Sequence, residues 1–387
     1  RLLVEGPEQV SISLTAPGGR HFTLMLVHHN IFGPGSRLLQ SDGSHSAINA
    51  SEARHYRGVV AEYPQSFAAL SAFDGELAGV ISIPEAGNFV LGKTIEQGDG
   101  ALHILYAERD QTVRPLFECA TMESPLPVPA SPDTIYPDRC KTVKIFLECD
   151  YQLFLDRNKS AVQVKNYVGS LFNVVKTLYY NDGIGIEISD IMVWTTKDPF
   201  LHTELSSILY HYSGYRQNNF TGNLAQLVTT YKPAEPGGVA FLGTLCYSTN
   251  GAGGPHSFAY IYNSFNQLPA YSWSVEVMAH ELGHNFGSPH THACAWGPFR
   301  NEALDNCRAT EGGCTPGPMP TEGGTIMSYC HLTSYGINFS KGFGAEPAAL
   351  LRYKVQTKSC VLPAFLPETW TTEPVPHLEG DGTELRV

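Results

Sequence analysis

The 387-residue sequence lacks features that would place it in several common functional classes. No apolar run approaches the ~20 residues of a membrane-spanning helix, so we expect no membrane span in this piece. Its 25 Lys and Arg residues are outnumbered by 37 Asp and Glu residues, giving a formal net charge of −12. A nucleic-acid or anionic-membrane partner would require a basic face, so we expect neither partner.

The beginning of the chain also lacks familiar marks. It starts at Arg1 rather than Met, and no charged-then-apolar leader follows. We therefore expect a processed or excised piece of a longer protein, whose targeting segment is not visible.

Nine cysteines are present, but none forms a Cys-x-x-Cys pair, which disfavours a structural zinc ribbon. Four of them crowd into residues 294–330, which favours a disulfide set in a secreted protein. Because nine is odd, at least one cysteine must be free, intermolecular or metal-bound. The nine are Cys119, Cys140, Cys149, Cys246, Cys294, Cys307, Cys314, Cys330 and Cys360.

The length predicts two compact units. Residues 1–119 read as short β-rich runs separated by turn residues, which predicts a mostly β domain. Residues 120–139 contain many prolines and no periodicity, as in a linker. Residues 140–362 form the second unit, and the acidic, proline-containing residues 363–387 are predicted to be a linker or tail.

Strands and helices alternate in the second unit, which predicts an α/β (α+β) layer arrangement with a mixed twisted sheet. Apolar residues at helical spacing, including Val164, Val168 and Leu171, support the first and longest helix. We expect strands within 141–150, 183–194 and 237–248, and helices within 157–181, 201–217 and 274–287.

Residues 280–290, HELGHNFGSPH, concentrate metal-binding chemistry. Residues four apart share one face of a helix, so His280 and His284 can grip one metal ion. Glu281 is rotated to the side of that face, where it can reach a metal-bound water without being a ligand. The order His-Glu-x-x-His is a zinc-protease signature in which the glutamate is the general base.

Gly287 predicts the end of this helix, because glycine takes the left-handed conformation without a Cβ penalty. The turn would bring His290 back to the same ion. Three nitrogens plus one water leave the open position that zinc catalysis requires, and zinc lowers the pKa of such a water toward ~7. A histidine pair alone is usually surface or core chemistry, but the full eleven-residue pattern is far more restrictive.

GGTIMSYC, residues 323–330, supplies a second element. Met327 follows a glycine turn downstream of His290, where the long zinc-protease pattern ends in a Met-turn. A loop methionine is ordinarily core filler, but its place after the third histidine favours the specific interpretation.

At this point the chain resembles the metzincin metalloproteases and, within them, the reprolysin (adamalysin) family. HELGHNFGSPH and TIMSYC carry the first resemblance. GGVAFLGTLCYS and the N-terminal stretch HYRGVVAEYPQSFAALSAFDGELAGVIS carry the second, over about residues 20–362. The resemblance implies a secreted or cell-surface zinc endopeptidase that acts on protein or peptide substrates. The resemblance further implies a zymogen, in which a prodomain, residues 1–119, would inhibit the catalytic domain, residues 140–362. We expect a monomer.

The resemblance also implies finer features. Residues 237–246 would be the sheet edge that pairs with the substrate backbone. Tyr329 is unusual for an adamalysin; it is either a packed tyrosine or a hydroxyl that stabilises the oxyanion. Calcium is not favoured, because Lys144 and Pro363 stand nearest to the usual ligand positions. The implied disulfides are Cys246–Cys360, Cys294–Cys330 and Cys307–Cys314.

Cys119, near the end of the β-rich unit, is the candidate latency switch. Reprolysin zymogens carry a cysteine near this point whose sulfur occupies the open zinc position, and a fourth protein ligand closes a catalytic site. The neighbours Glu118 and Ala120 do not match the usual switch motif. A Cys119–Cys140 disulfide across the linker is the alternative. Cleavage within 120–139 would release the prodomain.

Three functions compete. An active zinc endopeptidase is favoured over a catalytically silent adhesion or binding protein on the same scaffold, because Glu281 and all three histidines are retained. A metallohydrolase of small substrates is disfavoured by the expected edge strand and prodomain. His292 and His331 lie near the motifs in sequence only, and we expect neither as a metal ligand.

Overall fold

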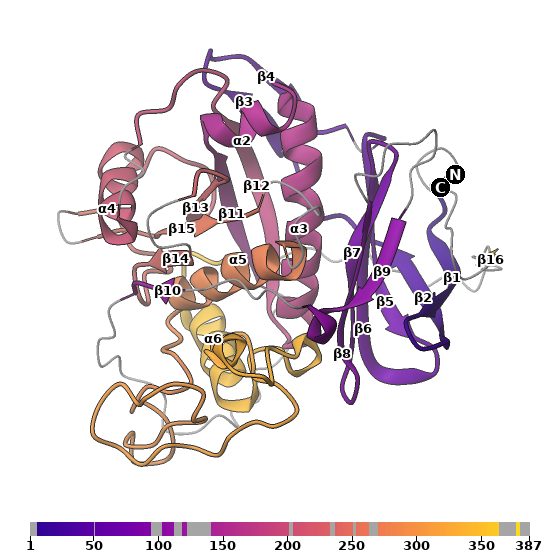
Figure 1. Ribbon diagram of the computed structural model, residues 1–387. Helices are drawn as coiled ribbons and strands as arrows, with labels where there is room; N and C mark the ends of the chain where they lie inside the picture. The colour runs from indigo at the N-terminus through magenta and orange to yellow at the C-terminus, as the bar shows by residue number, and fades with distance from the viewer. Residues whose placement is uncertain are drawn as a thin grey trace.

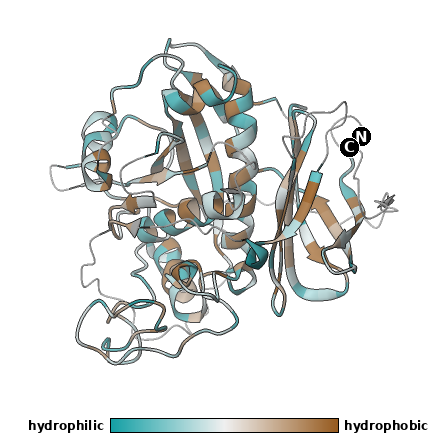
Figure 2. Cartoon of the chain, viewed as in Figure 1, coloured by the Kyte–Doolittle hydropathy of each residue, from teal (hydrophilic) through white to brown (hydrophobic). Residues whose placement is uncertain are grey.

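The computed structural model describes residues 6–49, 51–93, 103–111, 118–121, 141–200, 204–232, 237–250, 253–262, 270–363 and 377–379. Two eight-stranded sheets form its framework, and one long helix, α3, lies between them (Figure 1). Hydrophobic residues gather on the strands of both sheets and on that helix (Figure 2). No helix within the described ranges combines the length and the apolar character needed to cross a bilayer.

The first sheet is an antiparallel meander, to which β16 adds a parallel edge strand beside β1. The turn that joins β6 to β7 consists of Asp74 and Gly75 alone, both with positive φ (49° and 73°). Asp-Gly favours such a two-residue hairpin, because its twist matches that of the strands. In sheet order the strands are β16(His377–Glu379), β1(Gln9–Ala16), β2(Arg20–His28), β5(Ala53–Val60), β6(Tyr63–Phe73), β7(Glu76–Ile83), β8(Gly87–Lys93) and β9(His103–Ala107).

The second sheet is mixed, as the sequence predicted. Its central strands run parallel, and β14 turns antiparallel to β15 near one edge. The parallel strands are buried on both faces, which explains their continuous apolar runs. In sheet order the strands are β10(Glu118–Cys119), β14(Gly237–Ala240), β15(His256–Tyr260), β13(Leu224–Thr229), β11(Thr142–Cys149), β12(Gly185–Val193), β3(Arg37–Gln40) and β4(His45–Ala47).

The three helices predicted from periodicity are present, and a fourth long one, α6, was not predicted. The Ser160 side chain caps α3 by accepting a hydrogen bond from the backbone N–H of Gln163. Gly287, with φ of 117°, follows the last residue of α5 as expected. The helices are α2(Tyr151–Asp156), α3(Ala161–Asn181), α4(Leu205–Arg216), α5(Ala270–Phe286) and α6(Ala345–Thr357), with short 3-10 turns η1(Glu108–Asp110), η2(Cys330–Leu332) and η3(Phe339–Lys341).

We call residues 1–119 the N-terminal unit and residues 140–362 the second unit. Strands of the N-terminal unit pair with both edges of the sheet that the second unit forms. The hairpin β3–β4 extends that sheet beyond β12, and β10 extends it at the opposite edge beyond β14. Arg37 anchors the hairpin, because its backbone N–H and its guanidinium both donate to Asp190. The boundary near residue 119 therefore divides the sequence but not the sheet.

The interface between α3 and the first sheet contains a buried polar network. On α3, the Asn173 Oδ1 accepts a hydrogen bond from His29 Nε2 at 2.6 Å, and its Nδ2 donates to the carbonyls of Tyr56 and Leu70. His55 on β5 bonds through its ring to the Ser71 hydroxyl at 2.9 Å. Burial lowers the pKa of His55 to about 3 and that of His29 well below 6.5. Both rings are therefore neutral in the folded chain.

This network predicts acid sensitivity. The pKa of His55 is below its ordinary value of 6.5, so the unfolded chain binds the extra proton first as pH falls. Its full contribution to stability is present above about pH 7 and is lost progressively toward pH 3, by up to ~1.4 kcal/mol per pH unit. We expect His55→Gln to flatten the pH dependence of the urea-unfolding free energy between pH 7.5 and 5. His45→Gln, at an exposed histidine of β4, is the control. An unchanged slope in His55→Gln would refute this account.

Candidate metal centre

Helix α5 and the turn after it bring three imidazoles to one point. His280 and His284, one helical turn apart, have their Nε2 atoms 3.1 Å from each other. Gly287 then redirects the chain, and the Nε2 of His290 lies 3.1 Å from that of His284. All three side chains are buried. The spacing in HELGHNFGSPH thus produces one compact cluster of nitrogens.

The other nitrogen of each ring fixes its orientation. His280 Nδ1 lies 2.8 Å from the carbonyl of Ile326, and His284 Nδ1 lies 2.8 Å from that of Ser288. A carbonyl only accepts, so each Nδ1 carries the proton and each Nε2 presents a bare lone pair. Bare lone pairs converge in a buried site only around a cation. Zn–N bonds of about 2.0–2.1 Å in a tetrahedron put the nitrogens roughly 3.3 Å apart, so this donor set fits zinc.

Cys119 supplies a fourth donor from the N-terminal unit. Its Sγ lies 3.3 Å from His284 Nε2, and it forms one group of potential metal ligands with the three histidines. Strand β10 holds it there by pairing in parallel with β14, with Cys119 opposite Gly238. Cys119 is a free thiol, and Cys140, its partner in the alternative disulfide, lies outside the described residues.

Glu281 lies beside this cluster, fully buried. Its Oε2 is 3.7 Å from Cys119 Sγ and 3.4 Å from the Thr121 hydroxyl. Burial raises the pKa of the Glu281 carboxyl to about 8. A Cβ on Gly238 would lie 2.5 Å from the Glu281 side chain, so only glycine at that edge position leaves room for it. The carboxylate is therefore confined between helix and edge strand.

Met327 packs against helix α5, and the Tyr329 ring lies beside the rings of His280 and His290. Met327 is buried, and a Cβ on Gly283 would lie 2.6 Å from its sulfur, which explains the glycine inside the helix. The Tyr329 hydroxyl accepts from the backbone N–H of Cys119 at 3.0 Å and donates to its carbonyl at 3.2 Å. Tyr329 therefore holds the Cys119 backbone in place through two hydrogen bonds.

Glu311 is a functional candidate that the sequence did not reveal. Its carboxylate lies 3.0 Å from His290 Nδ1 and 3.1 Å from His292 Nε2. Burial acts to raise its pKa, but the bonds to His290 and His292 hold that pKa well below its usual range. Glu311 stands in an irregular loop 21 residues from His290, where no spacing rule relates the two.

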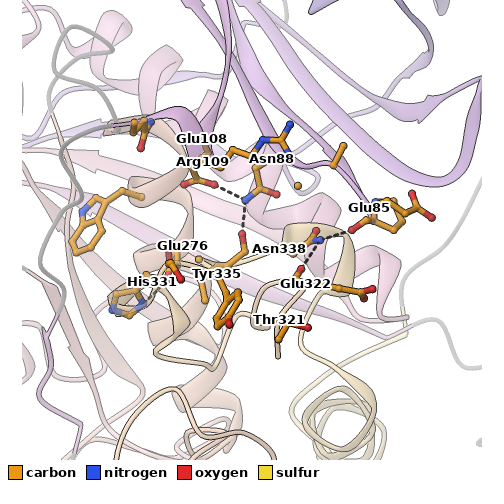
Figure 3. Close-up of a pocket in the computed structure, with 18 residues that line it drawn as sticks. Glu85, Asn88, Glu108, Arg109, Glu276, Thr321, Glu322, His331, Tyr335 and Asn338 are labelled. Carbon is orange, nitrogen blue, oxygen red and sulfur yellow. Dashed lines mark hydrogen bonds and ion pairs between the residues drawn. The ribbon is translucent and has the colours of Figure 1, made fainter. Parts of the chain in front are cut away.

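His331 is not in the cluster. Its Nδ1 lies 3.0 Å from Glu276 Oε1, and both residues line a cavity (Figure 3). His292 contacts the cluster only through Glu311 and ring stacking on His290.

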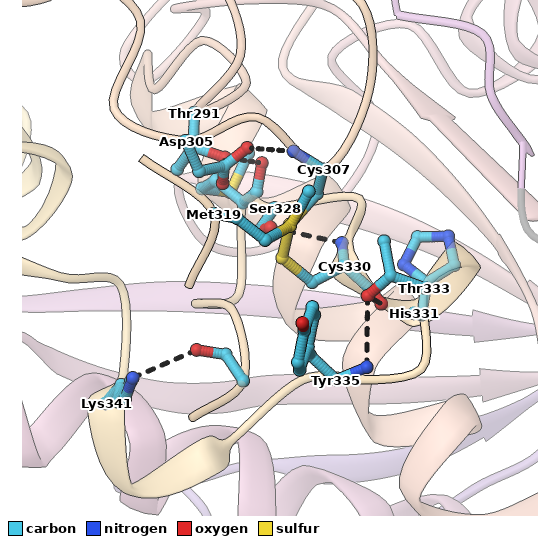
Figure 4. The surroundings of a disulfide bond; sticks show 12 residues. Thr291, Asp305, Cys307, Met319, Ser328, Cys330, His331, Thr333, Tyr335 and Lys341 are labelled. Atoms are coloured by element: carbon cyan, nitrogen blue, oxygen red, sulfur yellow. Dashed lines mark hydrogen bonds between the residues drawn. A yellow bond between two sulfur atoms is a disulfide. The ribbon is translucent and has the colours of Figure 1, made fainter. Parts of the chain in front are cut away.

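The disulfides partly correct our expectations. Cys246–Cys360 joins the edge region to the end of the second unit, as the resemblance implied. The other two pairs are Cys294–Cys314 and Cys307–Cys330, so the expected Cys294–Cys330 and Cys307–Cys314 pairs are wrong. Cys294 and Cys314 are adjacent because the chain at Ala293 bridges to Glu311. Cys307–Cys330 ties the loop to the residue after Tyr329 (Figure 4). Cys149 is a buried free thiol.

Comparison with known proteins decides the family. The reprolysin model of metallo-peptidase family M12 matches residues 139–340, just over half of the chain. The chain belongs to metallo-peptidase family M12. This M12 chain is 24% identical over 262 residues to disintegrin and metalloproteinase domain-containing protein 1a of Mus musculus, covering 63% of this chain and 31% of that protein. It is 26% identical over 321 residues to the Rattus norvegicus protein 1, covering 77% and 37%.

The M12 chain therefore spans about a third of the length of these curated relatives. Among solved structures, metalloproteinase-II from Bacteroides fragilis aligns with 73% of this chain and 82% of its own, at 12% identity and a TM-score of 0.40. The family is one of zinc metalloproteases, and the His and Cys cluster is a group that could hold such an ion.

The Glu311 contacts predict an effect on metal affinity. A carboxylate that accepts from a ligating histidine fixes the ring and raises its basicity, and its loss typically costs 10–100-fold in affinity. We expect Glu311→Gln to weaken zinc binding by that factor in a chelator competition titration. Glu322→Gln, which removes an exposed carboxylate from the same loop, is the control. If the two variants bind zinc with equal affinity, the Glu311 carboxylate does not support the His290 ligand.

Proposed function

We propose that the chain is the latent form of a zinc-dependent endopeptidase that acts outside the cell on protein or peptide substrates. The observation that carries this proposal is the convergence of three histidine Nε2 atoms with a buried glutamate beside them. His280, His284 and His290 would hold the ion. The competing function, a silent binding protein on the same scaffold, would not need Glu281 in reach of the ligand cluster.

Zinc bound there would lower the pKa of a water and polarise the substrate carbonyl. Glu281 would accept a proton from the attacking water and deliver it to the leaving amine. Its raised pKa suits this exchange, because a group that titrates near the working pH both takes and gives a proton. Tyr329, once released from the Cys119 backbone, would donate its hydroxyl to the oxyanion.

Latency would arise from two contacts of the same short segment. The Cys119 sulfur would complete the metal coordination, since zinc ionises a coordinating thiol. The backbone around it pairs with β14, where Ala120 N–H donates to Gly238 O at 3.1 Å. A substrate would add a strand to this same edge, so β10 and substrate exclude each other. Cleavage within 120–139, mostly outside the described residues, would release residues 1–119 as the inhibitory prodomain.

Two observations support an extracellular site of action. The described residues of the second unit include three disulfides, and such bonds persist in oxidising compartments. The curated relatives are named for metalloproteinase and disintegrin domains. We expect the domain to act as a monomer.

The general-base assignment gives a direct test. In the Cys119→Ser background, Glu281→Ala should bind zinc normally but lose at least ~10²–10⁴-fold in casein hydrolysis, because the proton acceptor is gone. Activity of Cys119→Ser itself should disappear with a chelator and return with added zinc. Glu302→Ala removes a carboxylate elsewhere in the loop and should be neutral. Full turnover by zinc-loaded Glu281→Ala would exclude the mechanism.

The switch assignment gives a second test. Cys119→Ser should hydrolyse peptides before any chain cleavage, whereas the parent and Cys149→Ala, at the other free thiol, should stay latent. In the Cys119→Ser background, Tyr329→Phe should lower kcat and leave KM nearly unchanged. The loss corresponds to an activation free energy higher by up to ~3 kcal/mol. If Cys119→Ser is as latent as the parent, the N-terminal unit inhibits by steric blockage alone.

A further inference from the structure

A cavity of about 370 Å³ lies between the two units (Figure 3). One wall comes from α5 and the segment after Tyr329, with Trp273, Glu276, His331 and Tyr335. The opposite wall belongs to the N-terminal unit, from the β7–β8 turn and η1. Its volume is within the range of ligand pockets. The metal centre described above does not use it.

The inner wall of this cavity continues directly from the metal centre. Glu276 and Trp273 stand four and seven residues before His280 on α5, so they extend the ligand-bearing face by one and two turns. Tyr329 lies between the metal centre and this wall, because its ring is 6.3 Å from that of His280 and 5.3 Å from that of His331. A group bound in the cavity would thus lie one side chain away from the reacting centre.

The wall formed by α5 and the segment after Tyr329 carries a buried carboxylate. The Glu276 side chain is only 5% exposed, and its Oε1 accepts no well-formed hydrogen bond from any described residue. His331 Nδ1 is close to it, at 3.0 Å. Carboxylates of Glu85, Glu108 and Glu322 also line the cavity, against one guanidinium, that of Arg109. A buried carboxylate with acceptor capacity left over is costly unless a cation binds it.

The Glu108 carboxylate differs from that of Glu276. It accepts from Asn88 Nδ2 and from Ser272 Oγ, each at 2.6 Å, and so ties η1 of the N-terminal unit to α5. Both of its oxygens already accept hydrogen bonds within the protein, so its role is to hold the two walls of the cavity together. Glu276 is then the anionic group with capacity to receive one, and Trp273 adds an aromatic wall on which a flat cation can stack.

We propose that this cavity is a specificity pocket for a positively charged substrate side chain, Arg or Lys, which Glu276 binds at a position flanking the scissile bond. The proposal rests on the endopeptidase function proposed above. Arg matches it best, because a planar guanidinium pairs with a carboxylate and stacks on an indole. In the latent chain the N-terminal unit forms the far wall of the pocket.

The first experiment needs no catalysis. 4-Aminobenzamidine carries a flat amidinium, and its neutral isostere 4-aminobenzamide lacks the charge. We expect the amidine to bind the full chain at least ~10-fold more tightly in a fluorescence titration, because a charge-assisted hydrogen bond is worth ~1.5–3 kcal/mol. Glu276→Gln should abolish the difference, and Glu322→Gln, at an exposed carboxylate of the same cavity, should keep it. His331→Asn should bind the amidine more tightly, so it replaces Glu276→Gln if that variant does not fold.

The second experiment identifies the ligand as a substrate side chain. The Cys119→Ser chain is given a proteome-derived peptide library, and cleavage sites are read by mass spectrometry. Arg and Lys should be enriched at one fixed position beside the scissile bond, and Glu276→Leu should replace them with apolar residues. Equal binding of amidine and amide, or a cleavage profile that Glu276→Leu leaves unchanged, overturns the proposal. Amidine binding with no peptide cleavage, either by Cys119→Ser or by the chain cut within residues 120–139, would refute the endopeptidase function while leaving the cation site standing.

Discussion

Three bare imidazole nitrogens in a buried site, with that of His284 3.1 Å from each of the other two, are the constraint on which the rest of this structure depends. Such an arrangement is unfavourable without a cation, so the orientation of each ring must be fixed by a hydrogen bond at its other nitrogen, Nδ1. The carbonyls of Ile326 and Ser288 fix two rings, and the Glu311 carboxylate fixes the third. The Met-turn, the loop that carries Glu311 and the glycines near the helix are thus parts of one scaffold, whose purpose is to hold three donors in place against their mutual repulsion.

Residues 118–121 form a very short segment that binds beside these three histidines. The Thr121 hydroxyl accepts from the Ala240 backbone at 2.9 Å, and Ala120 donates to Gly238. The Tyr329 hydroxyl bonds both the N–H and the carbonyl of Cys119. Each contact is worth about 1 kcal/mol, but together they place the thiol in the ligand cluster. Because the segment belongs to the same chain, its effective concentration at the edge strand is high, so weak contacts suffice.

Sequence reasoning succeeded where one helix or one turn sets the geometry. His280, Glu281 and His284 share a helix, and Gly287 fixes the return to His290, so their spacing determines their positions. It failed for the second and third disulfides, because residues 294–330 lack a period that would order four cysteines. Glu311 was missed for the same reason. The hairpin β3–β4 was missed because its strands are short and its pairing with β12 joins residues about 150 apart.

The two attachments of the N-terminal unit differ greatly in strength, and this difference bears on how latency could end. Strand β10 contributes two residues at an edge, whereas Phe67 and Val80 of the first sheet share one hydrophobic core with α3. At about 25 cal/mol per Å² of apolar surface, the shared core outweighs the edge contacts many-fold. Cutting the chain after residue 121 would free β10 to fray from β14 while the sheet stayed packed on α3. Under the proposed latency, exposure of the metal centre would begin with withdrawal of the short segment, and release of residues 1–119 would follow as a second and more costly step.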